Sequence, residues 1–214
     1  FIGWVSARNA LASPLNVPAV RVLTLLGPAS LVERLRELGL NLRQDGDFYG
    51  YSLALGSADV TLLELTNAYR ALANLGQAQA VNVRMDQSMA AFRPVMDPGA
   101  SWIVGDMLSD RQARVLTFGL DSALSTPFWS AVKTGTSKDM RDNWALGWTE
   151  HYTVGVWVGN SAGQSMQDVS GVSGAAPIWH EVISVLNHYR PGRQTVRPEQ
   201  VQLRQIVFVP ALEP

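Results

Sequence analysis

The sequence has no cysteine and is poor in charge, since 16% of its 214 residues are charged against about a quarter in typical soluble domains. The absence of cysteine excludes disulfides, thiolate metal sites and a cysteine nucleophile. The 17 basic and 18 acidic residues give a net charge of -1, so the chain has no overall positive charge to hold a phosphate backbone, and we do not expect nucleic acid as a partner. The 3 histidines lack the H-x-x-x-H and H-E-x-x-H spacings, so we predict neither a metal nor a cofactor.

Long hydrophobic runs are also lacking. No apolar stretch reaches the ~18 residues of a membrane span, so no span is expected within this sequence. The hydrophobic content of 47% is still enough to bury a sizeable core. The sequence begins at Phe1 and shows no signal-peptide pattern, which leads us to interpret it as a piece of a longer protein.

The first half of the chain is predicted to be mainly helical. Apolar residues recur at helical spacing after a capping box formed by Thr61 and Glu64, and Gly76 ends this run. Weaker patterns predict a loop at residues 41–50 and two short strands within residues 79–96. Further helices are predicted at residues 7–13, 17–26, 31–38 and 97–108.

Strand-like alternation replaces the helical spacing after Pro127. The runs are joined by links too short for crossover helices, so they should form an antiparallel meander. The fold class is therefore α+β, an antiparallel sheet with helices. The predicted elements are strands at 128–137, 143–149 and 152–159, a helix at 176–189, and a tail at 191–214 with one possible strand at 206–209.

The most specific local signal is the K-T-G motif on the first of these strands, which comprises Lys133, Thr134, Gly135, Thr136 and Ser137. Glycine in a strand lets another backbone approach closely, and the flanking hydroxyls and ammonium are donors suited to a carboxylate. Taken alone, the motif also fits an edge strand with a solvated lysine.

Other segments accompany the motif in a fixed order. They are N-V-P-A-V at 16–20, Y-S-L-A-L-G-S at 51–57, D-N-W at 142–144, the strand at 152–159 and S-G-A-A-P at 173–177. Together with K-T-G they resemble the transpeptidase domain of class A penicillin-binding proteins, most closely the 1C type, over nearly the whole chain. The resemblance implies the penicillin-binding or β-lactamase-like transpeptidase fold. It also implies a peptidoglycan D,D-transpeptidase that crosslinks stem peptides through an acyl-serine intermediate and binds penicillin.

The resemblance implies roles for individual residues, because members of this family bring S-x-x-K, S-x-N and K-T-G together at one site. Lys133 would hold positive charge and orient a proton relay. Thr134 and Thr136 would bind the substrate carboxylate, and the N–H of Thr136 would form half of an oxyanion hole. Asn16 falls on the asparagine of S-x-N. The expected substrate-binding set is completed by Gly135, Ser137 and Trp144.

The sequence departs from the family pattern at the nucleophile. Its two lysines are Lys133 and Lys138, so the one S-x-x-K available runs from Ser130 to Lys133 and overlaps K-T-G on a strand. Positions i and i+3 of a strand project to opposite faces, whereas the family's pair shares one face of a helix. We therefore predict that the nucleophile is not in this chain, that the family's S-x-x-K lies upstream of Phe1, and that the chain alone does not acylate.

A second departure is Pro14, which stands where the serine of S-x-N is expected and has no hydroxyl. Ser13 is one residue out of register and is the alternative hydroxyl, so it remains a catalytic candidate. If Ser13 does not reach the site, the proton relay is impaired. The alternative function is then a non-catalytic scaffold that keeps the fold of the site.

A different serine hydrolase is a third interpretation, because residues 159–163 fit G-x-S-x-G with Ser161 as nucleophile. That motif requires a helix directly after it and parallel strand–helix–strand units before it, and neither is predicted here. His180 and His188 are the available bases, and Asp168 lies close to Ser161 in the sequence.

The resemblance also predicts an organisation for the parent protein. Residues 1–190 would be a partial transpeptidase domain, and 191–214 a tail toward a further C-terminal domain. A glycosyltransferase domain and a membrane anchor would lie upstream in the sequence. The parent protein would be located at the periplasmic face of the inner membrane. The expected partners are the D-Ala-D-Ala stem peptide, β-lactams and the rest of the parent chain. A sheet without its first strands should expose an unpaired edge.

Overall fold

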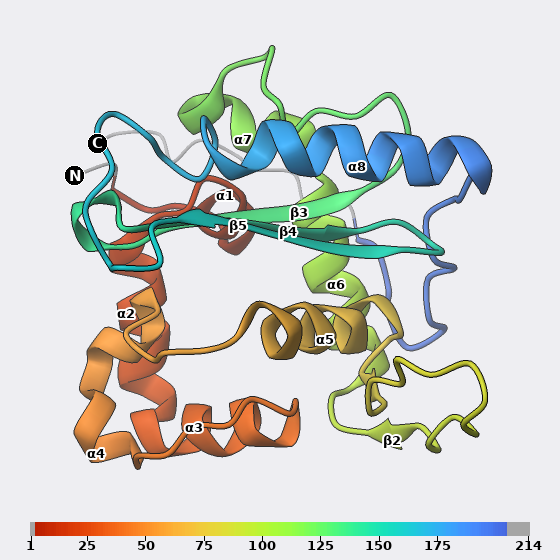
Figure 1. Cartoon of the computed structure of the whole chain (residues 1–214), viewed down its shortest axis with the longest axis horizontal. Coiled ribbons are helices and arrows are strands. Elements are labelled where there is room, and N and C mark those ends of the chain that lie inside the picture. Colours follow the sequence, from red (N-terminus) through yellow and green to blue (C-terminus); the bar gives the residue numbers. More distant parts are fainter. Residues whose placement is uncertain (1–2, 205–214) are drawn as a thin grey trace, which may run out of the picture.

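The computed structural model describes residues 3–204 and arranges their helices around a three-stranded sheet (Figure 1). Helix α8 lies across one face of this sheet and α5 lies under the other, with α3 beyond α5. The helical elements are α1 (Ala7–Ala12), α2 (Asn16–Leu26), α3 (Pro28–Glu37), α4 (Gly46–Tyr49), η1 (Gly50–Leu55), α5 (Leu62–Ala73), α6 (Pro98–Ser109), α7 (Arg111–Phe118), η2 (Lys138–Met140) and α8 (Ala175–Tyr189).

The main sheet consists of β3 (Ala131–Thr136), β4 (Asp142–Trp148) and β5 (Thr153–Gly159). The strands are antiparallel and adjacent in chain order, so the predicted meander and the α+β fold class are confirmed. The register places Lys133 opposite Leu146 and Gly135 opposite Trp144. Within the described residues β3 pairs with β4 alone, which leaves one side of β3 as an open edge.

Helix α8 packs on one face of the sheet. Val132 of β3 and Ala145 of β4 point toward it and join Trp179 and Ile183 in a single apolar cluster. These four side chains are at most 2% exposed. The cluster fixes the sheet against the longest helix of the chain.

Helices α5 and α6 cover the opposite face of the sheet. Ala131 and Trp148 cluster there with Leu108 of α6, and the rings of Trp148 and Tyr69 of α5 meet with centroids 6.1 Å apart. Alternate residues of a strand point to opposite faces. Lys133, two residues beyond Ala131, therefore points to the face of the sheet that α5 and α6 cover.

Helix α5 begins as its sequence predicts. The Thr61 side chain accepts a hydrogen bond from the Glu64 N–H, and the Glu64 carboxylate accepts one from the Thr61 N–H. Two of the N–H groups that a helix start leaves unpaired are thereby satisfied. Gly76, beyond the helix, has a φ of 84°, and a Cβ there would lie 2.2 Å from the Met96 carbonyl oxygen.

Two predictions of secondary structure differ from the observed elements, and the helical elements η1 and α7 were not predicted. The loop expected at 41–50 contains α4, which Asp45 caps by accepting a hydrogen bond from the Phe48 N–H. Helix α7 was not predicted, because its one apolar face is short, yet Asp110 caps it in the same way. Of the two strands expected at 79–96, only the short β2 (Arg93–Pro94) is observed within that range, and its partner β1 (Gln77–Ala78) precedes it.

No helix within residues 3–204 has the length and the apolar character needed to cross a membrane. The strand expected at 206–209 lies outside the described residues.

Candidate functional site

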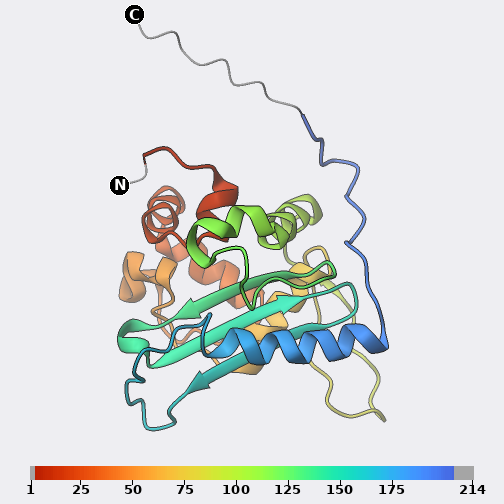
Figure 2. The same ribbon diagram turned by 90° about the horizontal axis from the view of Figure 1, so that it is seen from above.

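The K-T-G motif occupies the last four residues of β3 and the residue after it, so its predicted place on the first strand is confirmed. The strand is anchored at its start, where Ala131 and Val132 are 0% and 2% exposed, and it emerges toward Thr136, which is exposed. Figure 2 shows β3 as the edge of the sheet nearest α1 and α2. The motif therefore ends at an accessible edge beside the N-terminal helices.

Lys133 is held by the strand in a largely desolvated position. Its Nζ donates a hydrogen bond to the carbonyl of Thr134 at 2.7 Å. Burial lowers the pKa of Lys133 to about 8, because a desolvated ammonium loses hydration. No carboxylate among the described residues lies within 4.0 Å of it to offset that loss. The side chain is thus a cation near neutral pH that gives up its proton more readily than an exposed lysine.

Gly135 could carry a Cβ without overlapping its neighbours. A Cβ built there would meet its nearest neighbour, the Cβ of Trp144, at 3.6 Å, which is ordinary van der Waals contact. The packing of the described residues therefore does not require glycine at this position.

Trp144 lies opposite Gly135 on β4 and is half-buried. Its ring is tilted against that of Trp157, with centroids 6.4 Å apart. The Trp157 Nε1–H donates to Asp142 at 3.0 Å, which holds the neighbouring ring in place. The structure thus brings Trp144, as expected, next to the K-T-G strand.

Thr136 is held by Gly171, a residue of the loop at 160–174 that was not among the predicted site residues. The Gly171 N–H donates to Thr136 Oγ1 at 2.9 Å. A Cβ at Gly171 would lie 2.5 Å from the carbonyl oxygen of Gly135, so the loop backbone lies directly against the strand. No local pattern indicates this contact, which joins residues 35 positions apart.

Ser137 closes the turn after β3. Its Oγ accepts a hydrogen bond from the Asp142 N–H at 2.9 Å, and its own N–H donates to the Asp142 carbonyl at 2.9 Å. The hydroxyl expected to bind substrate is therefore also an element of the β3–β4 connection.

Of the two residues considered for the S-x-N motif, Asn16 is exposed and Ser13 is buried. Asn16 is the first residue of α2 and is exposed, with no side-chain hydrogen bond to residues 3–204. Ser13 is 3% exposed, and its Oγ donates to the carbonyl of Ala113 at 2.7 Å. The Ser13 hydroxyl is thus engaged with α7, and within residues 3–204 it makes no hydrogen bond to Lys133.

The other two serines considered as nucleophiles have local roles. Ser130 is buried, and its hydroxyl lies 2.8 Å from that of Thr126 rather than on Lys133. Ser161 is exposed in the turn after β5, and within the described loop at 160–174 no helix follows it. His180 directs its Nδ1 to the Ala123 carbonyl at 2.9 Å. The nucleophile elbow required for a hydrolase of that type is therefore not formed at Ser161.

Comparison with known proteins finds no matching family model, but it finds clear relatives. The chain is 36% identical over 187 residues to "Penicillin-binding protein 1C" of Escherichia coli (strain K12), covering 87% of this chain. It is 31% identical over 210 residues to "Penicillin-binding protein 1A" of Aquifex aeolicus (strain VF5), covering 92% of this chain. The chain belongs to the penicillin-binding protein family. It spans about a quarter of the length of these two relatives, 24% and 28%.

Solved penicillin-binding proteins share the fold. Penicillin-binding protein 1A from Haemophilus influenzae matches with a TM-score of 0.73 at 19% identity, over 90% of this chain and 36% of that one. The PonA1 protein from Mycobacterium tuberculosis, solved in complex with penicillin V, matches with a TM-score of 0.71 at 18% identity, over 92% of this chain and 60% of that one. The predicted penicillin-binding fold is therefore confirmed.

Proposed function

We propose that this chain is the part of a peptidoglycan D,D-transpeptidase that presents the K-T-G strand to the terminal carboxylate of a stem peptide. One observation carries the proposal: the edge of β3 that pairs with no strand of the described residues combines Lys133, a desolvated cation, with Gly135, a glycine that packing does not require. The carboxylate of a β-lactam has the same chemistry, and we propose β-lactams as ligands of the same strand.

The side chains and the backbone of β3 would act together on such a ligand. Lys133 supplies positive charge on the α5 and α6 side of the sheet, and Thr134 and Thr136 supply hydroxyls on its α8 side. An open strand edge offers unpaired N–H and C=O groups, so an extended peptide can pair with it and pass close to Gly135. Asn16, at the start of α2, is proposed to bind the substrate amide, and Trp144 to line the cleft.

The covalent step needs a serine from outside this sequence. In the proposed reaction its hydroxyl oxygen attacks the carbonyl between the two D-alanines, and the terminal D-alanine leaves with a proton. An amine of a neighbouring stem peptide then takes the acyl group and frees the serine. Lys133, whose pKa of about 8 lies near working pH, is proposed to take part in the proton relay.

A non-catalytic scaffold is the second candidate, and Pro14 and Ser13 favour it. Pro14 has no hydroxyl for the relay, and the hydroxyl of Ser13 is engaged with the Ala113 carbonyl. In that case the strand would still bind the carboxylate but turnover in the parent would be impaired. Changing Pro14→Ser in the intact parent distinguishes the two, because an unchanged rate of penicillin acylation would contradict an impaired relay.

The experiment that tests the proposed ligand is a titration of the ¹⁵N-labelled chain with penicillin V, followed by its amide spectrum. We expect saturable shifts at residues 133–137 and at the Trp144 indole. Shifts confined to other parts of the chain, or none, would contradict binding at the K-T-G strand.

For the parent protein we propose a periplasmic enzyme anchored to the inner membrane that also carries a glycosyltransferase domain.

A further inference from the structure

A cavity of about 220 Å³ lies between α7 and the segment that leads into β3. Its volume is roughly that of seven water molecules in the liquid. Ser130, which lines it, directly precedes β3, so the cavity lies about 20 Å along the strand from Thr136. The cavity is therefore separate from the K-T-G end of the strand.

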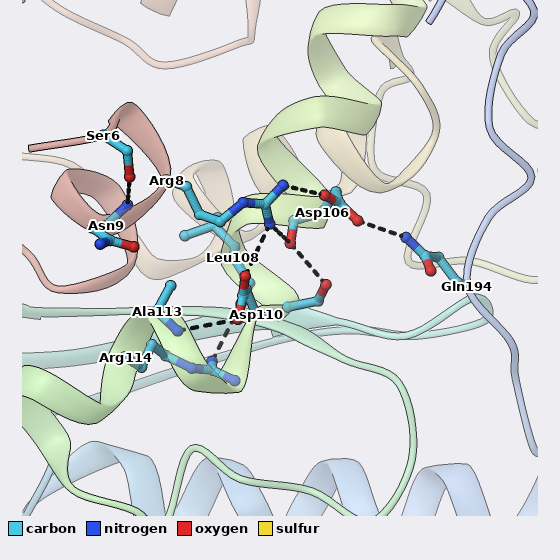
Figure 3. Close-up of polar contacts among 10 residues, drawn as sticks. Ser6, Arg8, Asn9, Asp106, Leu108, Asp110, Ala113, Arg114 and Gln194 are labelled. Atoms are coloured by element: carbon cyan, nitrogen blue, oxygen red, sulfur yellow. Dashed lines mark hydrogen bonds and ion pairs between the residues drawn. The ribbon is translucent and has the colours of Figure 1, made fainter. Parts of the chain in front are cut away.

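Arg114 is the most deeply buried cation in the cavity wall, at 4% exposure. Its Nη1 donates to the carbonyl of Leu108 at 3.2 Å (Figure 3). A guanidinium has five N–H donors, and this is the one hydrogen bond that the Arg114 side chain makes within the described residues. Burial lowers the pKa of Arg114 to about 10, which reflects its lost hydration.

The neighbouring carboxylates are engaged with another arginine. Asp110 caps α7 by accepting from the Ala113 N–H at 3.0 Å, and its second oxygen accepts from Arg8 at 3.2 Å. Arg8 also pairs with Asp106 at 2.6 Å, as Figure 3 shows. No carboxylate of residues 3–204 lies within 4.0 Å of Arg114. The buried guanidinium therefore lacks the ion-pair partner that usually accompanies such a group.

The rest of the cavity wall also suits an anion. Arg111, exposed at the start of α7, adds a second guanidinium. Thr126 donates its hydroxyl hydrogen to the Phe128 carbonyl at 2.7 Å. Ser130 is therefore the donor in its hydrogen bond with Thr126, and rotation of the Ser130 O–H can redirect this donor to a ligand. Trp129, which lines the cavity, has a buried Nε1–H with no acceptor among the described residues.

We propose that this cavity binds a small oxyanion, a carboxylate or phosphate group, with Arg114 as its principal partner and Arg111 as a second cation. The planar fork of arginine donates two parallel hydrogen bonds to such groups. The cavity is large enough for the oxyanion together with a small apolar body against the ring of Trp129.

Titration of the ¹⁵N-labelled chain with inorganic phosphate, and separately with acetate, tests the proposal, with sodium chloride at matched ionic strength as the control. We expect a saturable shift of the Trp129 indole signal with phosphate, acetate or both, and none with chloride. Saturation by phosphate alone assigns a phosphate group, and saturation by acetate alone assigns a carboxylate. A charged hydrogen bond lost in Arg114→Gln should weaken the affinity on the order of tenfold to a hundredfold.

Two further variants keep the proposal falsifiable if Arg114→Gln does not fold. Arg111→Gln removes an exposed charge of the cavity and should weaken binding about threefold to tenfold. Arg21→Gln removes an exposed charge on α2 and should bind as the unaltered chain does. No saturable shift with either anion overturns the proposal. The proposal is also overturned if Arg111→Gln binds the anion with the same affinity as Arg21→Gln.

Discussion

Gly135 and Gly147 lie on neighbouring strands of one sheet, yet the fold requires only one of them. A Cβ at Gly147 would lie 2.5 Å from the Ala131 carbonyl oxygen and 2.6 Å from the Trp179 ring. A Cβ at Gly135 would meet nothing closer than 3.6 Å. Gly147 is thus explained by packing inside the sheet and α8. Gly135 is not, and the space beside it is where we propose that a ligand approaches.

The largest effect is expected at the packed glycine. Gly147→Ala should lower the free energy of unfolding by about 3 kcal/mol, because the added methyl overlaps a carbonyl oxygen and a buried ring. Urea denaturation followed by circular dichroism measures it, and Gly135→Ala is the matched control. Equal stability of the two variants would remove the distinction between these glycines.

Lys133 lies on the same face of the sheet as Gly135, the face that α5 and α6 cover. Its buried charge should lower the stability of the fold. Its folded pKa of about 8 lies below the ordinary lysine value of 10.5, so between these values the unfolded chain binds more protons and stability rises with pH. Lys133→Met should be more stable than the unaltered chain by about 2 kcal/mol at pH 7, and the gap should close by about pH 10.5. Urea midpoints across this range test the sign, and a gap that widens with pH would contradict it.

Gly135→Ala is expected to separate binding from folding. Its free energy of unfolding should stay within about 0.5 kcal/mol of the unaltered chain, since no atom is displaced. Its affinity for penicillin V should fall about tenfold, because the methyl occupies the proposed approach to the strand. The same amide titration measures this, and undiminished affinity would show that the space beside Gly135 is not used.

The smallest effect concerns Ser13. Ser13→Ala removes the donor to the Ala113 carbonyl and should cost about 1 kcal/mol of stability. Penicillin V should shift residues 133–137 as before. A weakened titration without a loss of stability would instead return Ser13 to the site.

Local patterns predicted most of the fold. The capping box of Thr61 and Glu64 predicted the start of α5, and the alternation after Pro127 predicted the meander and the place of K-T-G. The sequence also indicated, from its two lysines, that Ser130 is not paired with a catalytic lysine on a helix. These features depend on neighbours in the chain, which is why a single sequence contains them.

Long-range contacts could not be predicted. The hydrogen bond from Gly171 to Thr136 and the one from Ser13 to Ala113 join positions far apart in the chain. The room for a Cβ at Gly135 depends on how β4 and its tryptophan pack. The short helix α7 was missed because its stability comes from the Asp110 cap and from packing against α1 rather than from a long apolar repeat.

The intact mass of the chain after incubation with penicillin V tests the central claim most directly, namely that it holds the recognition strand of a transpeptidase site without the nucleophile. We predict an unchanged mass, because no serine here is paired with a lysine on one helical face. A stoichiometric increase equal to the mass of penicillin V, mapped to Ser13, Ser130 or Ser161, would contradict that claim.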